Sequence, residues 1–226
     1  MSPKKGYAWV LDSKSSTAKK SKPKRSTSIP PKNEKDTAST IYILEVTLEY
    51  VEPKVWRLFT VPGTITLSQL HEALLVVMGW EGRHAWEFDV QGTHYGDSFA
   101  AEDPSLQEAN NAVLHNTVSM RGTVVDYIYD WGDEWHHQIK VQDIRKREAT
   151  ESSPVILDGA NACPPEDVGG VPGYAIFLEA IEDSNHPEHE ELLEWVGGKW
   201  NPQKFDRKTH QRRLAFLAKK RQWAEP

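Results

Sequence analysis

The segment from Tyr127 to His137 carries the densest group of side chains that could take part in chemistry. It reads Tyr-Ile-Tyr-Asp-Trp-Gly-Asp-Glu-Trp-His-His. Asp130 and Asp133 offer carboxylate oxygens, which suit a hard divalent cation whose remaining positions hold water. Neighbouring strand residues point to opposite faces, so His136 and His137 cannot both join one cluster. The alternative is a tight turn, which Asp and Gly favour without any ligand.

Two further segments could supply ligands to the same site. The loop from Cys163 to Tyr174 places Glu166 and Asp167 between two prolines and a pair of glycines. This rigid acidic connection could equally serve only to cap the following helix. His84 stands beside a glycine-containing loop at the start of a strand, where a histidine often forms only structural hydrogen bonds. The candidate metal ligands are Asp130, Asp133, Glu166, Asp167, His84 and His137.

This set predicts a bound Mg²⁺ or Mn²⁺ and a metal-dependent hydrolase of phosphate esters, with His84 or His137 as ligand or general base. Carboxylates held close together need a cation, because like charges otherwise raise each other's pKa. A single cysteine, Cys163, excludes an internal disulfide and a multi-cysteine zinc site, so we expect oxygen and nitrogen ligands. Motifs for nucleotide binding, serine hydrolysis and zinc proteolysis are absent from the sequence.

The net charge of −6 is unevenly distributed. Residues 1–40 contain 10 basic and 3 acidic residues, residues 41–198 contain 8 and 28, and residues 199–226 contain 9 and 2. Basic ends of this kind could contact DNA phosphates, could contact the protein's own acidic body, or could simply be solvated. The candidate nucleic-acid contacts are Lys19, Lys20, Lys22, Lys24, Arg25, Arg212, Arg213, Lys219, Lys220 and Arg221.

The N-terminal segment has a composition that does not support a folded core. Ser, Lys, Thr and Pro dominate from Ser13 to Thr40, which predicts a disordered basic tail over residues 1–40. We expect a folded domain over residues 41–198 and a basic C-terminal helix within 199–226 that packs on it or extends from it. No apolar run is long enough to cross a membrane and no secretory signal is recognisable, so we expect a cytoplasmic protein.

The folded part begins with strand patterns and ends with helix patterns. A period of two in the apolar residues predicts a strand from Ile41 to Tyr50, followed by a second strand from Lys54 to Val61. The capping box Thr66-Leu-Ser-Gln69 starts a helix at Leu67, which Gly79 ends. Further strands are expected at 85–90, 93–95, 123–129 and 135–141, and a short helix after Pro104.

A loop from Ser152 to Gly173 separates the strands from three C-terminal helices, expected near residues 174–182, 187–196 and 206–223. Strands first and helices later, with one helix inserted after the first hairpin, indicate an α+β fold. The predicted architecture is a mainly antiparallel sheet with one inserted helix and C-terminal helices packed on it.

Several motifs in a fixed order resemble those of the Ri-plasmid open-reading-frame-three-like family. They are Val55-Trp-Arg57, Leu70-His71, Met78-Gly-Trp80 with His84 and Phe88, Tyr129-Asp-x-Gly-Asp133-x-Trp135-x-His137, and the loop Cys163–Tyr174. The resemblance covers about residues 41–210 and implies a compact α+β domain linked with mobile DNA, since members also occur as insertion-element passengers. It implies no known activity. The resemblance also implies further cysteines near Ile156 and Val168, which this chain lacks.

The sequence is therefore compatible with three functions. An accessory or DNA-associated module of a mobile element ranks first, because of the basic ends and the family context. A metal-dependent phosphate-ester hydrolase ranks second. A non-catalytic protein-interaction module ranks third, with the aromatic motifs serving only as core. The sequence does not decide whether the protein is an enzyme, and it names no protein partner.

Overall fold

The structure is a computed structural model, described here for residues 40–97, 104–148, 151 and 154–223. The basic tail predicted over residues 1–40 lies outside this part, apart from Thr40, and so do Lys19, Lys20, Lys22, Lys24 and Arg25. No helix in the described ranges is both long enough and apolar enough to cross a membrane.

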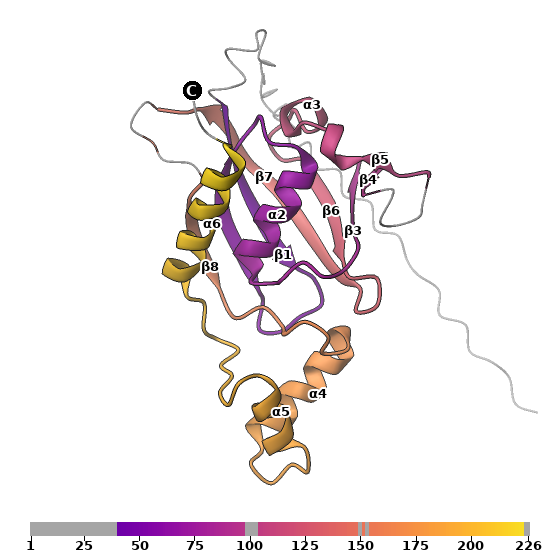
Figure 1. The fold of residues 1–226 in the computed structure, drawn as a ribbon, viewed down its shortest axis with the longest axis vertical. Coiled ribbons are helices and arrows are strands. Elements are labelled where there is room, and N and C mark those ends of the chain that lie inside the picture. Colours follow the sequence, from indigo (N-terminus) through magenta and orange to yellow (C-terminus); the bar gives the residue numbers. More distant parts are fainter. Residues whose placement is uncertain (1–39, 98–103, 149–150, 152–153, 224–226) are drawn as a thin grey trace, which may run out of the picture.

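One curved sheet of eight strands forms the body of the molecule (Figure 1). The strand order is β5-β4-β3-β6-β7-β1-β2-β8. Neighbouring strands are antiparallel, except that β4 and β5 are parallel. The strands are β1 Thr40–Leu48, β2 Trp56–Pro62, β3 Trp86–Val90, β4 Thr93–Gly96, β5 Gln107–Glu108, β6 Val124–Tyr129, β7 Trp135–Lys146 and β8 Ile156–Ala160.

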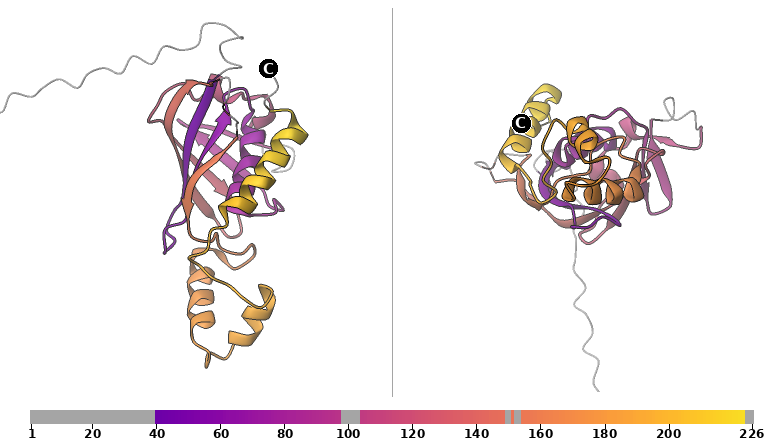
Figure 2. Two further views of the ribbon diagram at one scale, coloured as in Figure 1. Left: turned by 90° about the vertical axis from the view of Figure 1, so that its left-hand side faces the viewer. Right: turned by 90° about the horizontal axis from the view of Figure 1, so that it is seen from below.

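Helices cover one face of this sheet and one of its ends (Figure 2). Helices α2 and α6 lie side by side on one face, and α4 and α5 form a small lobe that projects from one end. The helices are α2 Leu67–Met78, α3 Leu114–Thr117, α4 Gly170–Glu182, α5 His189–Trp195 and α6 Arg207–Arg221, with a 3-10 helix η1 at Ala109–Asn111. The predicted α+β fold with a mainly antiparallel sheet is confirmed.

Helix α2 begins and ends where the sequence predicts. Both hydrogen bonds of the capping box are present, at 3.2 Å from Gln69 N to Thr66 Oγ1 and at 2.9 Å from Thr66 N to Gln69 Oε1. Gly79 follows the helix with a φ of 106°, a conformation that glycine adopts without strain. The buried residues of α2 and the alternating apolar residues of β1 belong to one hydrophobic core.

Two predicted boundaries were wrong. Tyr50 lies beyond the end of β1, has a φ of 63° and is 77% exposed, so it does not continue the buried face of that strand. The predicted loop from Ser152 to Gly173 contains strand β8, which pairs with β2. The composition of Ile156–Ala160 carries little strand signal, and its extended form depends on the edge of β2 as a partner.

Arg57 joins strand β2 to α2 and β8 from inside the molecule. Its side chain is buried, with 1% of its surface exposed. It donates to four main-chain carbonyl oxygens at 2.6–2.9 Å, those of Trp56, Val77, Ala160 and Asn161. The guanidinium also lies 3.7 Å from the centroid of the Phe205 ring. Burial lowers the pKa of Arg57 to about 10, and the carbonyl oxygens compensate for the lost hydration.

Candidate metal centre

His84 lies between two aspartates that come from distant parts of the chain. Its Nδ1 atom is 3.4 Å from Asp130 Oδ2, and its Nε2 atom is 3.2 Å from Asp167 Oδ1. One ring nitrogen and one oxygen from each aspartate lie within 4.8 Å of one another. Ligands of one ion with bonds of about 2.0–2.3 Å are separated by up to twice that length. The three side chains are therefore close to the spacing of a metal site.

The Asp130 side chain has two roles at the hairpin between β6 and β7. Its Oδ1 atom accepts from the main-chain N–H of Gly132 at 2.8 Å and of Asp133 at 3.4 Å, which is the turn structure that the residue types favour. Its Oδ2 atom faces His84. The turn and the candidate site therefore use different oxygens of one carboxylate, so the two interpretations of this motif are compatible.

Both aspartates are held in the left-handed region of φ. The φ of Asp130 is 61° and that of Asp167 is 63°. Aspartate tolerates this conformation better than most residues, but it still costs free energy that the surrounding structure must offset. The main-chain N–H of Asp130 donates to the carbonyl oxygen of Ala85 at 2.9 Å, which ties the hairpin to the residue that follows His84.

Glu166 joins the acidic loop to the segment before His84. Its Oε1 atom accepts from Tyr129 Oη at 2.5 Å, from Glu81 N at 3.0 Å and from Gly82 N at 3.3 Å. Burial and the adjoining Glu166 carboxylate raise the pKa of Tyr129, so its hydroxyl stays protonated and donates. Glu166 is thus committed to holding the two loops together and is not one of the three clustered ligands.

The side chain of Asp133 contacts the backbone of the same loop. Its Oδ2 atom accepts from Gly169 N at 3.2 Å. A Cβ atom at Gly170, where φ is 66°, would lie 2.5 Å from the carbonyl oxygen of Asp133. Glycine is required at this position because the hairpin and the start of α4 approach so closely. Asp133 therefore helps to bring Asp167 to His84, and its own carboxylate lies outside the cluster of three.

His137, the sixth candidate ligand, points into the core. Its ring meets Trp80 edge-on, with centroids 5.2 Å apart, and its Nδ1 atom lies 3.3 Å from the carbonyl oxygen of Tyr127. Burial lowers the pKa of His137 to about 3. Its neighbour His136 is exposed on the opposite face, as strand alternation predicts. The structure thus brings His84, Asp130 and Asp167 together, places Glu166 and Asp133 around them, and separates His137.

A cavity of about 430 Å³ opens beside this cluster. Glu166 and Asp167 lie on its wall, with Arg83 from the segment before His84. Trp80 lines the cavity and donates from Nε1 to the carbonyl oxygen of Pro164 at 3.0 Å, which fixes the prolines of the acidic loop. Sequence reasoning missed Arg83 as a site residue. Its position between a glycine and His84 is the signal that could have identified it.

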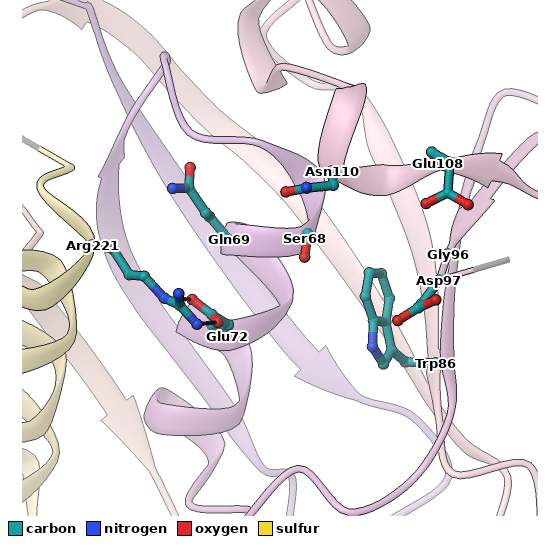
Figure 3. Close-up of a pocket in the computed structure, with 9 residues that line it drawn as sticks. All are labelled: Ser68, Gln69, Glu72, Trp86, Gly96, Asp97, Glu108, Asn110 and Arg221. Atoms are coloured by element: carbon teal, nitrogen blue, oxygen red, sulfur yellow. Dashed lines mark hydrogen bonds and ion pairs between the residues drawn. The ribbon is translucent and has the colours of Figure 1, made fainter. Parts of the chain in front are cut away.

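The basic residues of α6 have different surroundings. Arg221 pairs with Glu72 of α2 through two hydrogen bonds, beside a pocket of about 310 Å³ that Trp86 also lines (Figure 3). Arg212 donates to Lys208 O and Thr209 Oγ1 within its own helix. Arg213, Lys219 and Lys220 are exposed. All five candidate basic residues of α6 are thus exposed, and among them Arg221 is the one paired with a carboxylate of the described residues.

The sequence of this chain matches a family of known proteins over most of the described residues. The profile of the plasmid pRiA4b ORF-3-like proteins matches residues 40–209. The chain belongs to this family. The resemblance inferred from the motifs is confirmed. The match includes all six candidate metal ligands and ends within α6.

Two similar proteins place this pRiA4b ORF-3-like chain among relatives of unknown role. The uncharacterized protein y4hQ of Sinorhizobium fredii (strain NBRC 101917 / NGR234) is 39% identical over 166 residues, covering 70% of this chain and 82% of the relative. The crystal structure of protein of unknown function MM3350 from Methanosarcina mazei Go1 has a TM-score of 0.68 and 32% identity, covering 75% of this chain and 96% of that one. Family membership therefore adds no specific function.

Proposed function

We propose that this protein binds a divalent metal ion through His84, Asp130 and Asp167. The observation that carries the proposal is the convergence of three separate chain segments on the His84 ring. One imidazole nitrogen with two carboxylate oxygens is a donor set that suits Mn²⁺ or Zn²⁺ better than Mg²⁺, which prefers oxygen alone. The buried Cys163 lies outside the set, and burial raises the pKa of its thiol.

The function that this site supports best is metal-dependent hydrolysis of a phosphate ester. A bound divalent ion would neutralise phosphate oxygens and lower the pKa of a coordinated water. The neighbouring cavity is large enough for a small ester. Arg83 on its wall pairs with Glu81 on the surface, and exchange of that partner would let it contact a second phosphate oxygen. We place this activity in the cytoplasm.

Isothermal titration calorimetry tests the metal site directly. Protein treated with a chelator and then titrated with Mn²⁺ and Zn²⁺ is expected to bind one ion per chain. His84→Ala and Asp167→Asn are expected to weaken binding at least about tenfold. Asp126→Asn, at an exposed carboxylate on β6, is the matched control and is expected to bind like the wild type.

A second measurement separates binding from catalysis. Hydrolysis of bis(4-nitrophenyl) phosphate should require added metal and should be lost in His84→Ala. A His84 ring that merely bridges two carboxylates without any metal ion is the competing explanation. Absence of metal binding by the wild type would support that explanation and refute the proposal, whereas metal binding without hydrolysis would refute only the enzymatic part.

One observation favours nucleic-acid association as a second candidate function. Phe216 is 70% exposed on α6, and Arg212, Arg213, Lys219 and Lys220 stand three and four residues away on both sides. An exposed aromatic ring among cations suits a single-stranded nucleic acid, because bases stack on the ring while the cations contact phosphates. Such an activity would fit an accessory protein of a mobile element.

Fluorescence anisotropy with a labelled single-stranded oligonucleotide tests this second candidate. Binding should weaken steeply as salt increases, and Phe216→Ala with Lys219→Ala should reduce affinity at low salt. Met120→Ala, at another exposed apolar side chain, is the control. Equal binding by all three proteins would exclude α6 as the contact surface.

A further inference from the structure

The lobe formed by α4 and α5 carries one sign of charge. Residues 170–198 contain seven acidic residues and neither lysine nor arginine. The lobe projects from one end of the sheet, away from α2 and α6 (Figures 1 and 2). Its surface is therefore strongly attractive to a cationic partner, and this attraction is separate from the metal site.

A groove between the two helices adds an apolar surface to this acidic lobe. The groove encloses about 470 Å³. Ile176 and Phe177 of α4 line it together with Leu192 and Trp195 of α5. Ile176 is 55% exposed and Trp195 is 47% exposed, so two large apolar side chains face solvent at one place. Exposed apolar surface gathered in a groove is typical of a binding site.

Carboxylates surround the groove and define the chemistry of its partner. Glu191 of α5 and Glu188, just before that helix, line it, and Asp167 lines it at the end nearest His84. A complementary ligand would insert aromatic or aliphatic side chains between the helices and place lysines against these carboxylates. A basic peptide segment with a short apolar core has this chemistry.

The N-terminal part of this chain contains such a segment. Residues 4–14 read Lys-Lys-Gly-Tyr-Ala-Trp-Val-Leu-Asp-Ser-Lys. They combine three lysines with Tyr7, Trp9, Val10 and Leu11, whereas Ile29 is the one large apolar residue from Ser13 to Thr40. Lysines alone are well solvated, whereas the aromatic and aliphatic cluster would gain free energy if an apolar surface covered it.

The chain is long enough to bring this segment to the lobe. Strand β1 begins at Thr40, opposite Lys146 of β7, while β7 begins at Trp135 next to the hairpin turn that contacts α4. The distance to the start of α4 is therefore about one strand length, or roughly 35–40 Å at about 3.3 Å per residue, and the groove begins within two turns of that point. The residues between Leu11 and Thr40 could span more than twice that distance when extended.

We propose that the groove between α4 and α5 is a docking site for residues 4–14 of the same chain. The proposal does not depend on metal binding, although Asp167 lies at both sites. Docking would cover the exposed Ile176 and Trp195 and would pair the acidic lobe with the basic tail. The basic tail would then contact the protein's own acidic surface.

The test uses full-length protein and a fluorescent synthetic peptide of residues 1–20, in the presence of EDTA so that the metal proposal plays no part. In the variant Trp9→Ala/Leu11→Ala the groove should be free, and the peptide should bind. Binding to the wild type should be at least about tenfold weaker, because its own segment competes at high effective concentration. No binding to the tail variant would refute the proposal.

Groove variants in the same tail-variant background locate the binding surface. Ile176→Glu and Trp195→Glu change exposed side chains, and circular dichroism will verify that each variant is folded. Each should abolish peptide binding, whereas Phe216→Glu on α6 should not. Unchanged affinity in both groove variants would place the peptide elsewhere and overturn the assignment.

Hydrogen exchange distinguishes docking within one chain from docking on a second copy. Amides of α4 and α5 should exchange more slowly in the wild type than in Trp9→Ala/Leu11→Ala. This difference should persist when the protein is diluted a hundredfold. A difference that disappears on dilution would overturn docking within the chain.

Discussion

The hydroxyl of Tyr129 donates to Oε1 of Glu166 over 2.5 Å and joins the end of β6 to the loop that carries Asp167. The same carboxylate oxygen accepts from Glu81 N and Gly82 N, just before His84. One glutamate thus connects all three segments that form the cluster of His84, Asp130 and Asp167. Glu166 therefore helps to assemble the site by holding these segments together, rather than by serving as a direct ligand.

Removing this hydroxyl should weaken both the fold and the site. We expect Tyr129→Phe to lower the free energy of unfolding by about 1–3 kcal/mol, because Glu166 loses a buried donor. We also expect Mn²⁺ affinity to fall about tenfold, as when a supporting residue of a metal ligand is removed. Urea unfolding and calorimetry measure the two effects. Tyr50→Phe, at a tyrosine that is 77% exposed, should change neither.

Replacing Arg57 with lysine should be strongly destabilising although the charge is kept. The guanidinium serves four carbonyl oxygens on three segments and stacks on Phe205, a geometry that a single ammonium group cannot reproduce. We expect a loss of about 3 kcal/mol or more in urea unfolding. The exposed Arg213→Lys should stay within about 0.5 kcal/mol of the wild type. A similar small loss at Arg57 would contradict its structural role.

Stability should fall as the pH decreases from about 6.5. Burial lowers the pKa of both His71 and His137 to about 3, so below their ordinary value of about 6.5 the unfolded chain binds protons that the folded chain does not. Each histidine then contributes a slope of about 1.4 kcal/mol per pH unit between those values. His137→Gln should flatten the pH dependence of urea unfolding, and Gln142→Ala, at a residue of the same strand that does not titrate, is the control for the substitution itself.

Adding one methyl group at Gly170 should separate the hairpin from the acidic loop. At Gly170 an added Cβ would lie 2.5 Å from the carbonyl oxygen of Asp133, and φ is 66°. Gly122 has a φ of 84° but no atom within 4 Å of an added Cβ, so Gly122→Ala measures the backbone strain alone. We expect about 1 kcal/mol of lost stability for Gly122→Ala and clearly more for Gly170→Ala, with weaker Mn²⁺ binding only in the latter. Equal losses would show that the close contact is unimportant.

Local sequence patterns were sufficient to predict the elements that short-range hydrogen bonds define. The capping box at Thr66 and the glycine at Gly79 predict both ends of α2, because the bonds that end a helix lie within one turn. Asp130 and Gly132 predict the hairpin turn for the same reason. Strand β8 escaped prediction because its residues adopt an extended form only when β2 offers its edge.

The candidate site shows the same division between what local sequence predicts and what tertiary packing decides. The sequence alone predicted the candidate residue types: carboxylates and histidines on a turn and a rigid loop, with one cysteine and therefore no thiolate cluster. Tertiary structure alone decided which side chains meet. His84 contacts Asp130 and Asp167 because Gly170 lets the loop pack on the hairpin. His137 is buried in the core, away from the cluster, because α2 covers that face of the sheet. Such contacts depend on how distant segments pack, and residue types at short spacing do not encode that.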